Sequence, residues 1–353
     1  MIDKYHLLNS DKGFHVKLLI LFSILAIAFI LSFLVGRYDL SVGLIWDILV
    51  AQLGKIPVLD KIFGYAPYWI STLETVVVQV RLPRIMCCIL VGGALSVSGA
   101  SYQTLFKNPM VSPDLLGVSA GAGFGAALCM LNDGNWWQIQ LAAFAFGLLA
   151  VTAAYTIGKL FGNSNITVLV LAGVVVSSVF QSLLSIIKTL ADTENTLPSI
   201  TFWLMGSMGR ADMKDLGVML LISIISLFLI FMFRHQINTL AAGENEALTM
   251  GVNVPRVKLI VVATSTLLTV CAVSICGIVG WIGMVVPHIA RILVGANYSK
   301  LVPISFAIGG VFLLLIDNMI RGPIGVDLPL GVLTSLIGTP VFVVLLTRAK
   351  KVW

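Results

Sequence analysis

The sequence predicts an all-α protein that crosses a membrane about ten times as a single domain over residues 1–353. Hydrophobic residues make up 58% of the chain and charged residues only 11%, whereas a soluble domain carries about 25% charged residues. The mean hydropathy is +1.02. The apolar residues come in runs of about 20, the length at which a helix crosses a bilayer. Each run should be helical because hydrocarbon offers backbone groups no other hydrogen-bond partners.

Ten apolar runs are candidate transmembrane helices. They cover residues 18–35, 85–105, 115–131, 137–157, 167–189, 216–233, 259–275, 278–294, 301–320 and 329–347. The first run could be a signal peptide. However, it is about 18 residues long and no small-residue cleavage site follows it, so we expect an uncleaved span.

Lysine and arginine set the expected orientation. If the N-terminus is cytoplasmic, more of them fall in inner than in outer connections, as the positive-inside rule requires. Both termini are therefore expected in the cytoplasm. Two connections are long, residues 36–84 outside and 234–258 inside. The outer one contains an amphipathic stretch, Leu44 to Leu53, that would suit a helix on the membrane surface.

Polar residues follow one face of two predicted spans. They are Ser177, Gln181 and Ser185 in the fifth span, and Gly331, Ser335 and Thr339 in the tenth. Residues spaced by four lie on one side of a helix. An uncharged polar face suits a path for a bulky ligand, but it equally suits hydrogen bonding between helices. The residues alone leave both interpretations open.

Charged groups within the spans are few. Asp317 lies four residues before Arg321, so the two can pair across one helical turn. A proton relay would need several such groups, so we favour structural pairing. His288 has no partner histidine or acid nearby in the sequence, and the five cysteines lie within apolar runs without metal-site spacing. We therefore predict no metal site.

Several motifs are absent from the sequence. It contains no G-x-x-x-x-G-K-[ST] loop, so the chain is not expected to bind ATP itself or to act as an enzyme. It contains no basic block interleaved with aromatic residues, so nucleic acid is not an expected partner despite the net charge of +6. No cofactor is predicted.

Four strings are more specific than this composition. They are Arg81-Leu82-Pro83-Arg84, Leu116-Gly117-Val118-Ser119-Ala120-Gly121, Leu240-Ala241-Ala242-Gly243-Glu244 and Leu328-Pro329-Leu330-Gly331-Val332. With the glycines and prolines between them, the chain resembles the FecCD-type permease family, the importers of iron-siderophore complexes, haem and vitamin B12. The resemblance covers about residues 75–348.

This resemblance implies a fold and a set of partners. Members have ten helices and work in an inner membrane as a permease dimer, with a second copy or a sister permease. Two cytoplasmic ATPase subunits bind the ATP, and a soluble binding protein delivers the ligand from outside. The inner loop, here about Asn238–Val254, would hold the coupling helices that rest in the ATPase cleft.

The resemblance also implies roles for particular residues. The coupling residues would be Leu240, Gly243, Glu244, Leu248 and Gly251. The fifth and tenth helices would line the pathway, which favours that role for Ser177, Gln181, Ser185, Ser335 and Thr339. Arg81, Arg84 and Arg321 would receive carboxylates of the binding protein, because arginine presents a planar fork of donors.

Three functions compete at this point. The favoured one is the permease of an ATP-driven importer for an iron-siderophore or a related metal chelate such as haem or cobalamin. The alternative is an ion-coupled secondary transporter, which would need more intramembrane carboxylates than Asp317. A structural subunit without a pathway is the third, and the polar faces disfavour it. The ligand stays open, because oxyanion importers share this scaffold.

Overall fold

The computed structural model describes residues 11–36, 38–54, 68–162, 166–322 and 328–349, and all regular structure in these residues is helical. The longer helices are α2 (Asp11–Ser32), α3 (Val42–Gly54), α6 (Leu82–Phe106), α7 (Val118–Leu131), α8 (Trp136–Gly162), α9 (Ile166–Leu190), α10 (Thr196–Leu204), α11 (Met213–Ala242), α13 (Val254–Cys276), α14 (Ile282–Val294), α15 (Tyr298–Arg321) and α16 (Leu330–Ala349). Short helical segments are α5 (Ser71–Thr75), η1 (Val76–Arg81), η2 (Pro113–Leu116) and α12 (Glu244–Thr249). The all-α fold class is confirmed.

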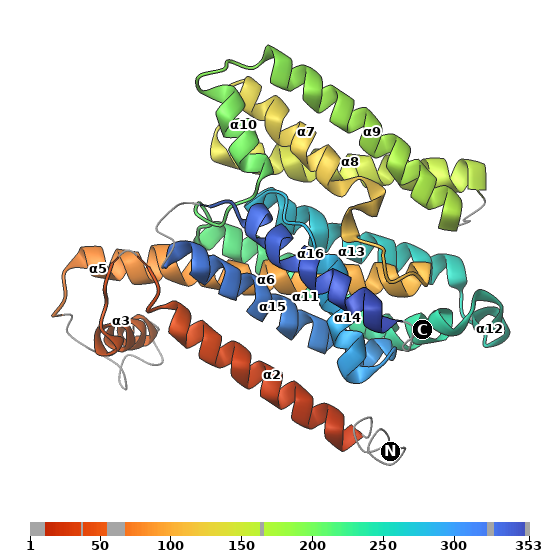
Figure 1. The fold of residues 1–353 in the computed structure, drawn as a ribbon, viewed down its shortest axis with the longest axis horizontal. Coiled ribbons are helices and arrows are strands. Elements are labelled where there is room, and N and C mark those ends of the chain that lie inside the picture. Colours follow the sequence, from red (N-terminus) through yellow and green to blue (C-terminus); the bar gives the residue numbers. More distant parts are fainter. Residues whose placement is uncertain (1–10, 37, 55–67, 163–165, 323–327, 350–353) are drawn as a thin grey trace.

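A helix lies at each of the ten predicted spans. Seven helical stretches among the described residues are long and apolar enough to cross a membrane: α2, α5 to α6, α8, α9, α11, α13 and α15. The helices α7, α14 and α16 are shorter and apolar. The number of crossings therefore stays a prediction. The predicted cytoplasmic termini, residues 1–10 and 350–353, lie outside the described residues. However, α2 begins and α16 ends toward the end of the molecule where α12 lies (Figure 1).

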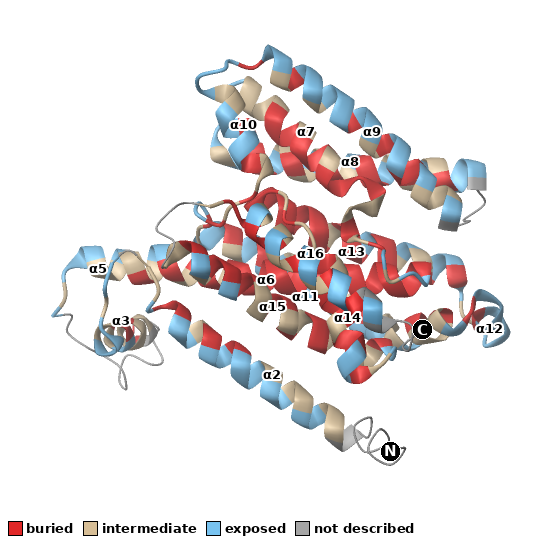
Figure 2. Cartoon of the chain, viewed as in Figure 1, coloured by how far each residue is buried: buried red, intermediate tan, exposed pale blue. Residues whose placement is uncertain are grey.

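The helices form two layers (Figure 1). Helices α7 to α10 make one layer, and α6, α11 and α13 to α16 make the other. Helix α6 is the centre of the second layer. In its most apolar stretch 94% of the residues are buried, and the helix is mostly red in Figure 2. Glycines allow this close packing, since a Cβ on Gly99 would lie 1.7 Å from the Gly283 carbonyl oxygen and one on Gly92 2.2 Å from that of Gly309.

Helix α2 runs along the outside of the second layer and packs against α15. Only 11% of the residues in its most apolar stretch are buried, and Leu25 and Ala28 are among the buried residues of the helix. Most of its other leucines and isoleucines are exposed, and Figure 2 shows these parts of the helix in pale blue. Such an apolar outer surface suits lipid rather than water.

The outer connection differs from the prediction. Residues 71–84 were assigned to the connection, but they are helical and continuous with α6, so the helix extends from Ser71 to Phe106. The π turn η1 lies in this extension, where the Leu82 N–H donates to the Val77 carbonyl. Pro83 explains the local irregularity, because it has no N–H to donate to the preceding turn. Residues 55–67 of the connection lie outside the described residues.

The amphipathic stretch in that connection is helical, as predicted, and forms α3. Figure 1 shows α3 nearly end-on, so its axis runs across those of α2 and α6. The phenol of Tyr68 donates to Asp47 at 2.6 Å and the Gln52 amide donates to Glu74 at 2.6 Å. These bonds attach α3 to the start of the long helix. Its place on a membrane surface stays a prediction.

Candidate functional site

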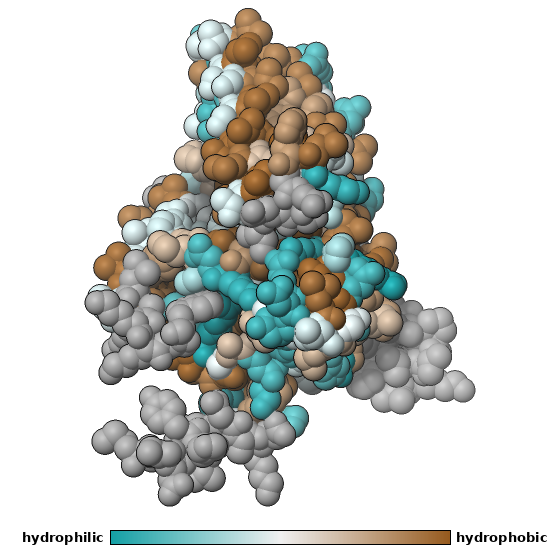
Figure 3. Space-filling view, turned by 90° about the vertical axis from the view of Figure 1, so that its right-hand side faces the viewer, coloured by the Kyte–Doolittle hydropathy of each residue, from teal (hydrophilic) through white to brown (hydrophobic). Residues whose placement is uncertain are grey.

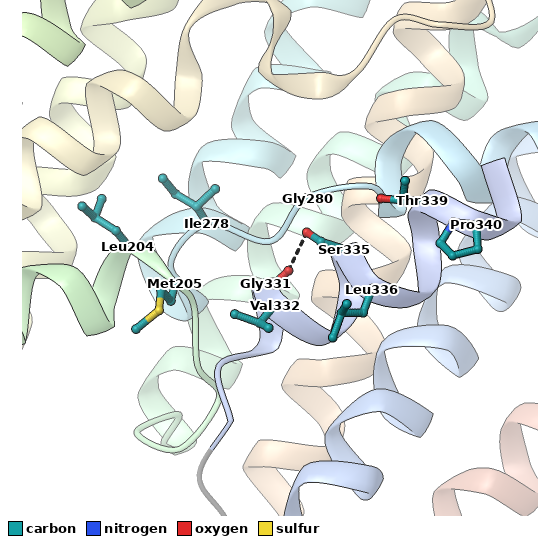
Figure 4. A pocket seen from close by; sticks show the side chains of 10 residues that line it. All are labelled: Leu204, Met205, Ile278, Gly280, Gly331, Val332, Ser335, Leu336, Thr339 and Pro340. Atoms are coloured by element: carbon teal, nitrogen blue, oxygen red, sulfur yellow. Dashed lines mark hydrogen bonds between the residues drawn. The ribbon is translucent and has the colours of Figure 1, made fainter. Parts of the chain in front are cut away.

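A hollow of about 780 Å³ opens between the two layers. Its lining residues come from the end of α10, the extended segment between α13 and α14, and α16 (Figure 4): Leu204, Met205, Ile278, Gly280, Gly331, Val332, Ser335, Leu336, Thr339 and Pro340. Ser335 and Thr339, two of the predicted pathway residues, are among them. The volume lies in the range of pockets that hold small molecules.

Backbone contacts hold the first turn of α16 at this hollow. The N–H groups of Leu330 and Gly331 donate to the carbonyls of Gly206 and Met205, each at 2.9 Å. These bonds satisfy donors that a helix N-terminus otherwise leaves unpaired. The Ser335 hydroxyl donates to the Gly331 carbonyl at 2.7 Å, as Figure 4 shows. Because this hydroxyl bonds within its own helix, it adds little binding strength to a wall whose side chains are mostly apolar.

The polar face of α9 does not line this hollow. Gln181 and Ser185 are exposed and Ser177 is half-buried. The opposite face of α9, with Val176, Phe180 and Ile187, is buried. The helix packs on α7, α8 and η2, whereas α16 packs on α14 and α15. The hollow therefore contains the predicted residues of α16 without those of α9.

At the end of the bundle that is predicted to face outside, called the outer end below, Arg84 and Arg321 share one buried carboxylate. The Arg84 guanidinium donates to both oxygens of Asp317, with Nη2 2.8 Å from Oδ1 and Nε 3.2 Å from Oδ2. Arg321 Nε lies 2.7 Å from Asp317 Oδ2, so the predicted pair is confirmed. The Asp317 side chain has no exposed surface, and those of Arg84 and Arg321 are 18% and 9% exposed. Bidentate pairing of this kind is strong and directional.

Arg321 and Arg81 hold the C-terminal end of α2. Arg321 donates to the carbonyls of Ser32 and Val35 at 3.4 and 3.2 Å. Arg81 donates to the carbonyls of Phe33 and Tyr38 and is 4% exposed. Cations at a helix C-terminus offset its unpaired carbonyls and its dipole. The three arginines, expected at the outer surface, are thus largely buried between α2, α6 and α15.

The outer cluster includes two residues that the sequence did not single out. Asn318 donates to the Ser32 hydroxyl at 2.7 Å and accepts from Arg321 Nη2 at 2.5 Å. Its place beside Asp317 on α15 was visible in the sequence, but its partner on α2 is 286 residues away. Only the fold shows that these groups form one network.

At the opposite end, which is predicted to face the cytoplasm and is called the inner end below, α12 projects from the bundle between α11 and α13. Figure 3 looks at this end and shows hydrophilic side chains gathered in the middle of the face. Glu244 Oε1 lies 2.7 Å from Lys258 Nζ, and Lys107 Nζ donates to the Ala242 carbonyl at 3.2 Å. These contacts brace α12 against the ends of α13 and α6.

The five predicted coupling residues divide into two groups at this end. Leu240 and Gly243 are buried and form the base of α12. Glu244, Leu248 and Gly251 are exposed, with Leu248 at 59%. A Cβ on Gly243 would lie 1.5 Å from a carboxylate oxygen of Glu246, so a larger residue there must displace that side chain. Gly251 ends the turn with a φ of +76°, a conformation that favours glycine.

Comparison with known proteins identifies this arrangement. Residues 24–348 match the FecCD transport family. The chain is 33% identical to the molybdate import system permease of Haemophilus influenzae over 93% of this chain and 94% of that protein. It is 36% identical to the probable iron chelatin permease of Helicobacter pylori over 80% of this chain and 86% of that protein.

Two further comparisons agree. The hemin permease of Yersinia pestis is 34% identical over 77% of this chain and 83% of that protein. A solved structure of a metal-chelate type ABC transporter, in an inward-facing conformation, has a TM-score of 0.81 at 32% identity, over 94% of this chain and 98% of that one. The chain therefore belongs to the FecCD transport family and is a multi-pass inner-membrane permease of an ABC importer.

Proposed function

We propose that this permease imports an iron-siderophore complex or a related metal chelate such as haem or cobalamin. The hollow at α16 carries the proposal. Its ten lining residues are apolar or uncharged, with only the hydroxyls of Ser335 and Thr339 on polar side chains. A bulky chelate with an organic outer surface can pass such a wall without being held, because no charged pair must be broken.

A second candidate cargo is an oxyanion, since one relative with high coverage imports molybdate. A small anion leaving water needs compensating charge or several hydrogen-bond donors. The lining of the hollow offers no cation and only two hydroxyls. The chelate is therefore the better match for this wall, and the two cargoes can be separated by experiment.

The partners are part of the proposal. Two cytoplasmic ATPase subunits would bind the exposed side of α12, where Leu248 and Met250 present apolar surface beside Glu244. A binding protein would dock at the outer arginine cluster, with Arg84 as the most accessible of the three. A second copy of the chain or a sister permease would cover the exposed polar face of α9 and close the open side of the hollow.

The test is uptake into proteoliposomes that contain the permease and its ATPase subunits, with ATP inside and the binding protein outside. We expect ⁵⁵Fe delivered as a siderophore complex, or iron as haem, to accumulate only with ATP. Radioactive molybdate in a parallel sample should stay outside. Liposomes loaded with ADP are the control. Accumulation of molybdate but of no chelate would contradict the proposed cargo.

A further inference from the structure

Asn238, near the end of α11, joins the base of α12 to the start of α15. Its Oδ1 accepts the backbone N–H of Tyr298 at 2.7 Å. Its Nδ2 donates to the Ser299 hydroxyl at 3.0 Å and lies 3.3 Å from Asn297 Oδ1. One amide therefore contacts three consecutive residues at the N-terminus of α15, although about 60 residues separate the two segments.

The orientation of this amide follows from its partners. The peptide N–H of Tyr298 can only donate, so the amide oxygen must face it and the amide nitrogen must face Ser299. Aspartate at this position would keep the acceptor and lose the donor, whereas alanine would lose both. The site thus uses both ends of an asparagine side chain, which links the two helices in a fixed direction.

Tyr298 carries the contact into the core. Its side chain has no exposed surface, and its phenol oxygen lies 2.6 Å from the Ser101 hydroxyl of α6. Helix α15 packs along α6 and α2 and also contacts α16, which lines the hollow. At its other end α15 carries Asp317 and Arg321 of the outer cluster. A displacement at Tyr298 would therefore act on the helix that joins the inner end, the hollow and the outer cluster.

The other braces of α12 lead elsewhere. Lys107 attaches the Ala242 carbonyl to the end of α6, and Lys258 attaches Glu244 to α13. The side-chain bonds described here that run from the base of α12 to α15 are those of the Asn238 amide. Hydrogen bonds through a short side chain transmit displacement better than long lysine side chains, which can follow a moving partner by changing rotamer.

We propose that Asn238 is the positioning residue that passes movement of α12 to α15 during transport. It rests on the proposed function, because the movement of α12 comes from ATPase subunits seated on it. Without the amide, α12 still binds the ATPase and ATP is still hydrolysed, but α15 no longer follows, so hydrolysis and uptake separate.

The experiment compares Asn238→Ala with the wild type in proteoliposomes that hold the complete importer. We expect ⁵⁵Fe-siderophore taken up per ATP hydrolysed to fall on the order of tenfold, within the usual range of coupling between sites. ATPase subunits should copurify with the variant as with the wild type. Asn132→Ala is the matched control, because the Asn132 side chain follows α7 directly and donates to the Leu128 carbonyl of that helix, without linking it to another helix among the described residues.

A second measurement separates coupling from simple stability. Hydrogen exchange of the peptide covering residues 296–302 should change when ATP is added to the wild-type complex and should not respond in Asn238→Ala. Ser299→Ala should lower coupling less, and the double variant should couple no worse than Asn238→Ala alone, since both residues belong to one link.

The outcomes are distinct. A wild-type ratio of uptake to hydrolysis in Asn238→Ala, or an unchanged ATP response in its α15 peptide, would overturn the link and leave the importer function intact. Absence of ATP-driven uptake in the wild type would overturn the proposed function and the link with it. A reduced ratio accompanied by the same reduction in Asn132→Ala would show general damage and would also overturn the link.

Discussion

The two ends of this permease differ in how they could receive the proposed partners. The outer arginines are already bonded inside the protein, to Asp317 and to the carbonyls that end α2. The inner helix α12 instead projects from the bundle and presents Leu248 and Met250 with little internal contact, at 59% and 72% exposure. A partner can be added at the inner end without breaking existing bonds. A partner at the outer end must compete with Asp317, so docking there is tied to the packing of α2, α6 and α15.

The largest effect should follow from removing the carboxylate at the centre of the outer cluster. Asp317→Ala leaves Arg84 and Arg321 buried without their shared anion, and losing one member of a buried pair costs about 3–5 kcal/mol. We expect a strong fall in membrane yield and in the thermal unfolding temperature in detergent. Asp133→Ala, an exposed residue of the outer side, is the control. Equal stability of the two variants would show that the outer cluster is not a structural unit.

A slightly smaller effect should separate docking from structure. Arg84 is the most exposed of the three arginines, so Arg84→Gln should reduce binding-protein affinity by about 2 kcal/mol or more, as for a desolvated interfacial pair. Titration of binding-protein-stimulated ATPase activity measures this. Arg210→Gln is the matched control, since Arg210 is exposed and stacks over Trp136 at 5.0 Å. A larger loss in the control would move the docking surface to Arg210.

At the inner end the stability of the permease should be unaffected. Leu248→Ser removes an exposed apolar side chain, and we expect weaker ATPase binding by about 1.5–2 kcal/mol, the free energy of burying a leucine. Size-exclusion chromatography of the complex measures the loss, and thermal unfolding should match the wild type. Ala247→Ser, at a buried position of the same helix, should reverse the pattern. A destabilised Leu248→Ser permease would contradict the contrast between the two ends.

The smallest effect on the structure is expected from cysteine substitutions in α9 and α16, between the outer and inner ends of the permease. Gln181→Cys and Thr339→Cys should react with water-soluble thiol reagents at rates that depend on ATP, because both positions face the proposed pathway. Val176→Cys, on the buried face of α9, should stay protected. Val179 and Leu183 of the same helix are also exposed in the single chain, so the protected control must come from the buried face that contains Val176. Equal reactivity at positions 176 and 181 would remove the pathway assignment for α9.

Hydropathy predicted the helices well because burial in lipid and helix formation impose the same pattern. It could not predict the long helix from Ser71, since Pro67 and Glu74 interrupt the apolar run in the sequence. A tertiary contact, the bond from Gln52 to Glu74, supports the acidic residue in the folded chain. Nor could hydropathy predict that α14 begins at Ile282, four residues after the start of the predicted span at 278. Gly277 and Trp281 adopt positive φ there, at 72° and 68°, where the chain passes the α10 end.

The functional residues show the same division. The i, i+4 spacing revealed the Asp317–Arg321 pair, which is a local property of one helix. The bond from Arg84 to Asp317 spans 233 residues and the bond from Asn238 to Tyr298 spans 60, and spacing carries no information about such contacts. The arginines could be identified as special residues, but their burial could not, because α2, which packs beside them, is distant in the sequence and lies nearly 300 residues before Arg321.

The loose packing of α2 bears on how the protein is made. Ser32 on α2 finds Asn318 on α15 only 286 residues later in the chain. At a synthesis rate of about 5–20 residues per second, α2 waits roughly 15–60 s in the membrane before that partner exists. A helix that remains mostly lipid-facing in the finished protein can wait in lipid. Arg81 reaches the carbonyls at its end early in synthesis, and Arg321 adds its bonds to the same end only when α15 has been made.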